Sequence, residues 1–182
     1  LKMIENIDKP ALSALWPNKK GMSVVLDLGA NIECSSKNLL DFSIMGASLY
    51  TSLYPGNKPN VGLLNIGSEE LKGNETIKET YQALNDKKSE NYDFSGYIEG
   101  NHLMDGNVNV IVSDGFTGNV ALKTAEGTAN FITSELKKAM TDSIIGKISS
   151  LLNISNLKKF KKRLDPRLYN GAIFIGLDSP VV

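Results

Sequence analysis

The chain has 182 residues, of which 41% are hydrophobic and 22% charged, so it suits one globular domain and is no collagen, coiled coil or disordered tail. Its 20 basic residues equal its 20 acidic residues, and this net charge of zero argues against a binder of nucleic acid or other polyanions. The one cysteine, Cys34, excludes an internal disulfide and a cysteine-based zinc cluster and favours a reducing cytoplasm, and no apolar run reaches the ~18–20 residues of a membrane span.

Short apolar runs closed by turns predict β-strands over residues 23–29, 61–67, 92–98, 108–115 and 172–177. Runs this apolar suit strands that are covered on both faces, as in a parallel sheet. Apolar residues at helical spacing predict helices over residues 36–54, 75–84 and 118–140. Strands that alternate with helices imply right-handed crossovers, so we expect a single α/β domain over residues 1–182 with a three-layer α/β/α architecture and a mostly parallel sheet.

Loops rich in glycine, asparagine and acidic residues follow three of these strands, over residues 26–33, 65–75 and 113–119. Ligands of open α/β sheets bind where strands end and helices begin, and helix-start amides suit an anion. Glycine also lets the backbone approach a ligand closely. We therefore expect the three loops to meet in an anion site, although ordinary turn chemistry would explain any one of them. None matches a dinucleotide or P-loop fingerprint.

The chain resembles the phosphate acyltransferase family (PlsX) in these loops and in other motifs. In the family's order, these motifs are LDLGANIE (26–33), DFSIMGASLY (41–50), VGLLNIGSEELKGNE (61–75), VSDGFTGNVALKTAEG (112–127) and RLD…YNGAIFIGL (163–177). The resemblance runs from about Leu12 onward. Because the family begins with a further Gly-rich α/β portion, we expect the chain to be the middle and later part of a longer protein.

The resemblance implies a reaction and a fold. Family members move a fatty acyl group from acyl carrier protein to inorganic phosphate, giving an acyl phosphate for bacterial phospholipid synthesis. Their fold is similar to that of isocitrate dehydrogenase-like and phosphotransacetylase-like enzymes, and no metal, nicotinamide or other cofactor is expected. Two alternatives stay open: a short-chain phosphate acetyl- or butyryltransferase, and an inactive fragment that acts only as a membrane- or carrier-binding module.

Attack of phosphate on a thioester needs donors for the phosphate and for the oxyanion, and no protein nucleophile if phosphate attacks directly. Lys72, followed by glycine and asparagine, is the best candidate to bind the phosphate. Asp114 could orient Lys72 or another donor. We expect catalytic roles for Lys72, Asn74, Asp114 and Asn119, and substrate-binding roles for Gly29, Asn31, Gly73, Gly115 and Gly118. His102 and Cys34 are interpreted as packing or surface residues.

Residues 134–165 predict an inserted, protruding helical hairpin with an apolar cluster followed by a basic one. The apolar residues are Ile144, Ile145, Ile148, Leu151 and Leu152, and the basic residues are Lys158, Lys159, Lys161, Lys162 and Arg163. This combination suits the anionic inner face of a membrane, to which the protein would bind peripherally. Packing against a second subunit in a homodimer explains it equally well, and the resemblance implies both. The basic cluster also suits the acidic acyl carrier protein.

Overall fold

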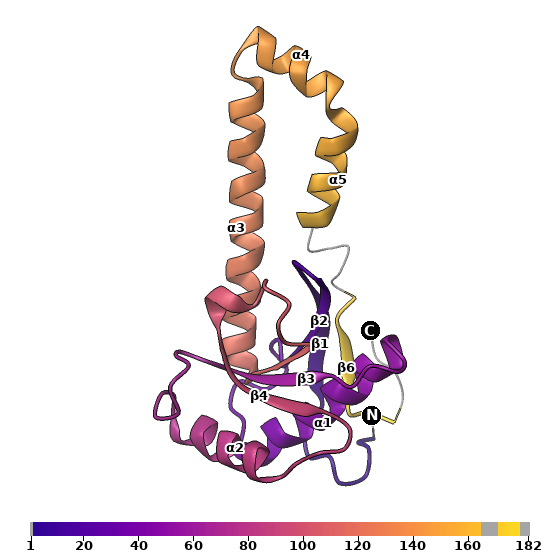
Figure 1. Ribbon diagram of the computed structural model, residues 1–182, viewed down its shortest axis with the longest axis vertical. Helices are drawn as coiled ribbons and strands as arrows, with labels where there is room; N and C mark the ends of the chain where they lie inside the picture. The colour runs from indigo at the N-terminus through magenta and orange to yellow at the C-terminus, as the bar shows by residue number, and fades with distance from the viewer. Residues whose placement is uncertain (1, 165–170, 179–182) are drawn as a thin grey trace.

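The computed structural model describes residues 2–164 and 171–178, with backbone alone for residues 147, 150 and 161–164 (Figure 1). The strands are β1 (Ala11–Asn18), β2 (Gly21–Leu26), β3 (Asn60–Asn65), β4 (Asp93–Glu99), β5 (Val110–Val112) and β6 (Ile173–Ile175). Within the described residues they form a six-stranded sheet in the order β4-β3-β5-β2-β1-β6. The four strands β4, β3, β5 and β2 pair in parallel, which confirms the mostly parallel sheet.

Helices lie on both faces of this sheet. The helices of the described chain are α1 (Ser36–Leu53), α2 (Glu75–Asp86), the 3-10 helix η1 (Gly100–His102), α3 (Gly115–Thr141), α4 (Ile144–Leu152) and α5 (Ile154–Leu164). The helices α1 and α2 lie below the sheet in Figure 1, and α3 rises from the opposite side. The expected α/β class with helices on both faces is confirmed.

Alternation along β2 divides the core between the two faces. Val24 and Leu26 belong to the cluster under α1, whereas Val25 belongs to the cluster that contacts the start of α3. The packing of α1 is close, because a Cβ at Gly46 would come within 2.6 Å of the Val110 side chain. This close packing places α1 directly against β2 and β5, the strands whose ends carry the first and third loops.

The antiparallel part of the sheet differs from the expectation. The strand β1 pairs antiparallel with both β2 and β6, and no strand was expected over residues 11–18. Its Pro17 is tolerated because β6 reaches only Ala11 to Ser13, so that β1 is an edge strand where the proline falls and no N–H is required there. The run at 172–177 therefore adds an antiparallel strand outside the parallel set.

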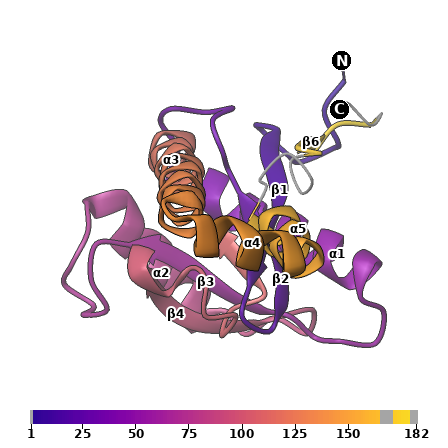
Figure 2. The same cartoon turned by 90° about the horizontal axis from the view of Figure 1, so that it is seen from above.

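The helix α3 begins at Gly115, three residues before the expected start, because the Asp114 carboxylate accepts from the Thr117 amide and caps it. The helix continues unbroken to Thr141, so the expected hairpin boundary at residue 134 falls inside it. We call residues 134–164 the arm: the end of α3, α4 across the tip, and α5 returning toward the sheet (Figures 1 and 2). Residue 165, the expected end of the hairpin, lies outside the described residues.

Candidate functional site

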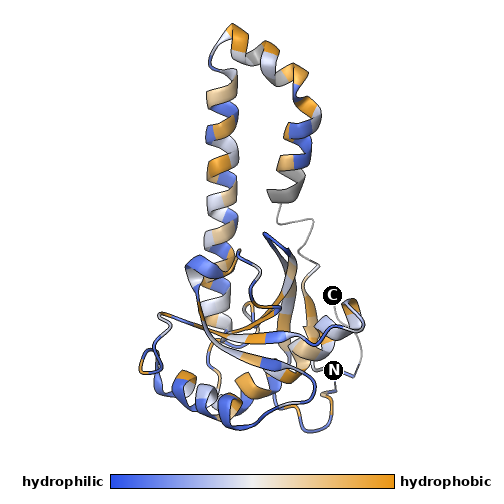
Figure 3. Ribbon diagram, in the orientation of Figure 1, coloured by the Kyte–Doolittle hydropathy of each residue, from blue (hydrophilic) through white to orange (hydrophobic). Residues whose placement is uncertain are grey.

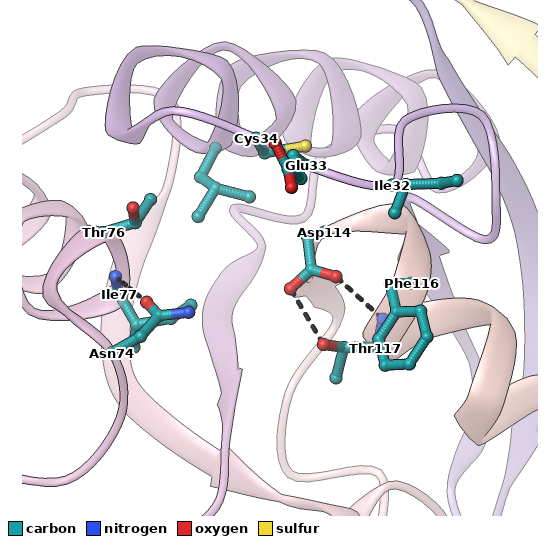
Figure 4. A pocket seen from close by; sticks show the side chains of 10 residues that line it. Ile32, Glu33, Cys34, Asn74, Thr76, Ile77, Asp114, Phe116 and Thr117 are labelled. Carbon is teal, nitrogen blue, oxygen red and sulfur yellow. Dashed lines mark hydrogen bonds between the residues drawn. The ribbon is translucent and has the colours of Figure 1, made fainter.

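The loops that follow β2, β3 and β5 meet at the carboxyl edge of the sheet, as expected from their order in the chain. Between them lies a cavity of about 470 Å³ (Figure 4). Its walls are Ile32, Glu33, Cys34, Leu39, Asn74, Thr76, Ile77, Asp114, Phe116 and Thr117. The cavity thus opens at the first turns of α2 and α3, where the backbone amides carry partial positive charge, although those of Ile77, Gly115 and Thr117 already have partners.

The first loop is shaped by Asp27, whose carboxylate is completely buried. It accepts five hydrogen bonds of 2.8–3.2 Å, from the backbone amides of Leu12, Gly29, Ala30 and Asn31 and from the Asn31 side chain. Sequence analysis gave Asp27 no role. The available signal was an acid at the end of an apolar strand, a residue type that hydrogen-bonds the backbone amides just after it.

Asn31 positions the loop, because both hydrogens of its amide are already used. Its Nδ2 donates to the Pro10 carbonyl at 2.7 Å and to Asp27 at 2.8 Å. The main-chain carbonyl of Asn31 accepts from the Gly115 amide at 2.7 Å and so joins the first loop to the third. The structure therefore leaves the Asn31 amide group no free hydrogen for phosphate or a carbonyl.

In the third loop, two glycines allow α3 to approach the first loop. A Cβ at Gly115 would lie 2.5 Å from the Asn31 carbonyl oxygen, and one at Gly118 would overlap the Asp27 carbonyl oxygen. The expected binding role of these two glycines thus has a packing explanation. The two oxygens of Asp114 accept from the amide and the hydroxyl of Thr117, each at 2.8 Å, and no hydrogen bond joins Asp114 to Lys72 within the described residues.

Asn119 lies one turn inside α3 and is therefore no helix cap. Its Nδ2 donates to the Leu28 carbonyl at 3.0 Å, beside Gly29, where a Cβ would come within 2.9 Å of that nitrogen. Gly29 has φ +136°, so its lack of a side chain matters for both conformation and space. One Asn119 amide hydrogen is thereby used, and the side chain itself is exposed.

In the second loop, Asn74 contributes a polar group to the cavity. Its Oδ1 accepts from the Ile77 amide at 2.9 Å and caps α2, while its Nδ2 points toward the middle of the cavity (Figure 4). Gly73 before it has φ +97°, and a Cβ there would lie 2.6 Å from Asn65 Oδ1. Asn65, which sequence analysis missed, is buried and donates to the carbonyls of Gly67 and Lys72, both at 3.1 Å.

Lys72 is exposed, and its side chain makes no hydrogen bond or ion pair with the described residues. It does not line the cavity, whose described walls carry the carboxylates of Glu33 and Asp114 and no cation. One basic side chain contacts these walls from outside: the Lys9 Nζ donates to the Glu33 carbonyl at 2.9 Å. An anion bound in this cavity therefore depends on helix amides and Asn74 unless Lys72 swings inward.

Cys34 is unsuited to nucleophilic attack. Burial, and next the charge of Asp27, raise the pKa of its thiol to about 11. His102, the only histidine of the chain, lies elsewhere, in η1, where its ring pairs with Asp105 at 2.8 Å. Among the described residues there is also no group of three or more histidine, cysteine or acidic side chains that could hold a metal ion.

The fold is that of the phosphotransacetylase class of α/β structures. A phosphotransacetylase from Streptococcus pyogenes superposes with a TM-score of 0.58, covering 100% of this chain and 49% of that protein at 14% identity. One from Staphylococcus aureus gives a TM-score of 0.56 over 70% of this chain and 44% of its own, at 15% identity. At such identities the likeness concerns the fold alone.

The chain belongs to the family described as fatty acid synthesis protein, whose model matches residues 1–182. All 182 residues of the chain align with a phosphate acyltransferase of Pelagibacter ubique at 82% identity, and they cover 55% of that protein. A phosphate acyltransferase of Maricaulis maris is 44% identical, again over the whole chain and 52% of its own length. The chain thus spans about half the length of the curated relatives it matches, and the resemblance seen in its motifs is confirmed.

Proposed function

We propose that the chain carries a site for acyl transfer from acyl carrier protein to inorganic phosphate. The observation that carries the proposal is the 82% identity to a phosphate acyltransferase over all 182 residues, a match that spans every loop that lines the cavity. A phosphate oxygen attacks the thioester carbonyl carbon, and the carbon–sulfur bond then breaks. The products are an acyl phosphate and the free thiol of the carrier, and no protein nucleophile or cofactor takes part. The raised pKa of the Cys34 thiol agrees with this direct route.

The residues in and around the cavity divide between two tasks in this proposal. The amides at the starts of α2 and α3, the Asn74 amino group and an inward-turned Lys72 bind the phosphate. Asn119, held to the Leu28 carbonyl beside Gly29, orients the thioester and donates to the oxyanion. Gly29, Gly73, Gly115, Gly118 and Asn31 keep the loops in place.

The test is phosphate-dependent release of free carrier thiol from acyl carrier protein. We would measure it with the chain itself and with a chimera in which the chain replaces the matching stretch of the Pelagibacter ubique relative. The chimera should turn over acyl carrier protein substrates only when phosphate is present. Turnover with acetyl-coenzyme A instead would support a short-chain transacetylase. No turnover with either donor, from a folded chimera, would overturn the proposal.

The arm supports a second proposal, peripheral binding to an anionic membrane. The side chains at its tip are apolar and face solvent: Ile145 and Leu152 are 81% and 82% exposed, and the α4 ribbon is largely apolar (Figure 3). Ile144, Ile148 and Leu151 are also exposed. Lys158 and Lys159 follow on α5, exposed and basic, while the side chains of Lys161, Lys162 and Arg163 lie outside the described part. No described helix has both the length and the apolar content to cross a bilayer.

A homodimer is the competing use of the same arm. Phe131, just before the arm, and Leu136, at the start of its shaft on α3, are 65% and 36% exposed, and a second copy would cover them. Exposed apolar patches of this kind mark protein or membrane contacts in folded proteins. The two uses are compatible if the shaft of the arm dimerises and the tip enters the bilayer, with the basic residues of α5 left to attract acidic acyl carrier protein.

A further inference from the structure

A second, larger cavity lies on the α3 face of the sheet, away from the carboxyl-edge site. Its volume is about 740 Å³, and its walls come from β1, the residues around η1, α3 and α5. The helices α3 and α5 stand on its two sides, above β1 and β2 (Figures 1 and 2). A volume in this range is typical of sites for small ligands.

The lining is largely apolar, and its charged side chains are already partnered. The Trp16 indole nitrogen donates to the Met104 sulfur at 3.0 Å within the wall. Of the charged lining residues, Lys19 pairs with Asp105 at 2.6 Å and Glu126 with Lys123 at 2.9 Å. The space between them therefore offers contacts to hydrocarbon and no unpaired charge, so it favours an uncharged apolar ligand.

One helix, α3, lines both cavities. The first turn of α3 lines the carboxyl-edge cavity at Phe116 and Thr117, and its next turns line the second cavity from Ala121 to Ile132. Ala121 lies two residues beyond Asn119, the residue proposed to orient the thioester. Eleven residues of helix cover about 16 Å. An extended alkyl chain zigzags, so each bond of about 1.5 Å advances it by about 1.3 Å, and roughly 13 carbons cover the same length.

We propose that the second cavity binds the fatty acyl chain of the thioester donor, running along α3 from Ala121 toward Ile132. This inference rests on the proposed function, because it takes the donor to be a fatty acyl thioester. Alanines at 121, 125 and 129 keep the wall facing the cavity small and leave room for the chain. Each methylene buried there should tighten binding roughly fourfold, which gives the site a preference for long chains.

The test is Ala129→Trp, which blocks the cavity after about 12 Å of helix, or roughly nine or ten carbons. In the chimera, kcat/KM for palmitoyl-carrier should fall at least tenfold, and kcat/KM for octanoyl-carrier should stay within twofold. The matched control is Asn130→Trp, an exposed neighbour on α3 that does not line the cavity, and it should change neither value. An equal loss for both substrates, or no loss, would overturn the inference.

Two further measurements separate other causes. If Ala129→Trp fails to fold, Ile132→Ala at the half-exposed far end should lower palmitoyl kcat/KM several-fold and spare octanoyl. If the chimera shows no transfer at all, fluorescence of cis-parinaric acid bound to the 182-residue chain still decides: binding that Ala129→Trp weakens and Asn130→Trp does not supports the acyl site. Conversion of a dimer to a monomer by Ala129→Trp, with both substrates affected equally, would assign the cavity to a second copy.

Discussion

Asp27 shows how one buried side chain can organise a site that it does not line. Its five hydrogen bonds hold the first loop against β1, and its main-chain carbonyl lies where Gly118 allows α3 to pass. The carboxylate is completely buried and does not line the carboxyl-edge cavity. It acts on that cavity only by positioning other residues. Its effect on activity should therefore follow its effect on the fold.

We expect Asp27→Asn to destabilise the chain by about 3 kcal/mol or more, since several buried amides lose a charged acceptor that is worth about 1.5–3 kcal/mol to each. Urea unfolding followed by circular dichroism measures this. The control is Asp93→Asn, whose carboxylate is 62% exposed and pairs with exposed Lys58, and which should cost no more than about 1 kcal/mol. Equal losses in the two variants would contradict the structural role of Asp27.

The two atoms of the Asn74 side-chain amide can be tested separately, because Oδ1 caps α2 and Nδ2 points into the cavity. Serine caps a helix as well as asparagine does, so Asn74→Ser should keep α2 stable and remove only the Nδ2 that points into the cavity. We expect the phosphate KM of the chimera to rise about tenfold or more, because one hydrogen bond to a charged group is lost.

Lys72→Ala should also raise the phosphate KM, whereas Lys58→Ala, at an exposed position remote from the loop, should not. Unchanged phosphate kinetics would remove the residue concerned from the site.

The Cys34 thiol gives a prediction on pH. Since its pKa is raised to about 11 by burial, the reactive thiolate should be about one part in a thousand at pH 8. Alkylation by iodoacetamide should be slow at pH 7–8 and should speed up tenfold per pH unit without a plateau below pH 10. The urea-unfolded chain should instead titrate near the ordinary thiol pKa of about 8.5. A plateau near pH 8 in the folded chain would show an exposed thiol.

At the level of elements, the parallel sheet was predictable because β2, β3 and β5 are short, continuous apolar runs covered on both faces. The convergence of the loops followed from the same pattern. The strand β1 was not predictable from periodicity, because its pairing is set by distant β6 and its Pro17 interrupts the pattern. Nor could spacing show that Gly115 and Gly118 serve packing and Asn31 serves the loop, since these roles depend on contacts between segments far apart in the chain.

Two glycines of α3 provide a matched pair of substitutions. A methyl group at Gly118 would overlap the Asp27 carbonyl oxygen, whereas one at Gly127 would meet nothing within 4 Å. We expect Gly118→Ala to destabilise the chain by about 2 kcal/mol or more through overpacking. Gly127→Ala should stabilise it by about 0.5–1 kcal/mol, because alanine favours the helix. Thermal unfolding of both variants measures the difference, and a Gly118→Ala variant as stable as the parent would show that α3 does not contact the first loop.

For the molecule as a whole, the arm extends far beyond the sheet and buries little of its own apolar surface (Figure 1). Membrane and dimer differ in how this surface responds to salt. Charge attraction weakens as the Debye length falls to ~3 Å at 1 M salt, but burial of apolar area at ~25 cal/mol per Å² does not. Binding through the tip should thus lose only part of its strength in high salt.

We therefore expect the double variant Ile145→Asp with Leu152→Asp to lose co-sedimentation with anionic vesicles at both low and high salt, while it keeps its oligomeric state and its acyl transfer in solution. The control is Ser149→Asp with Ser155→Asp, which adds the same charge to exposed polar positions of the arm and removes no apolar side chain. It should weaken binding at low salt only. The dimer alternative makes the opposite forecast, because the apolar double variant would then split the dimer on size-exclusion chromatography. In that case, neutral and anionic vesicles would bind equally poorly, since the tip would already be covered by the second subunit.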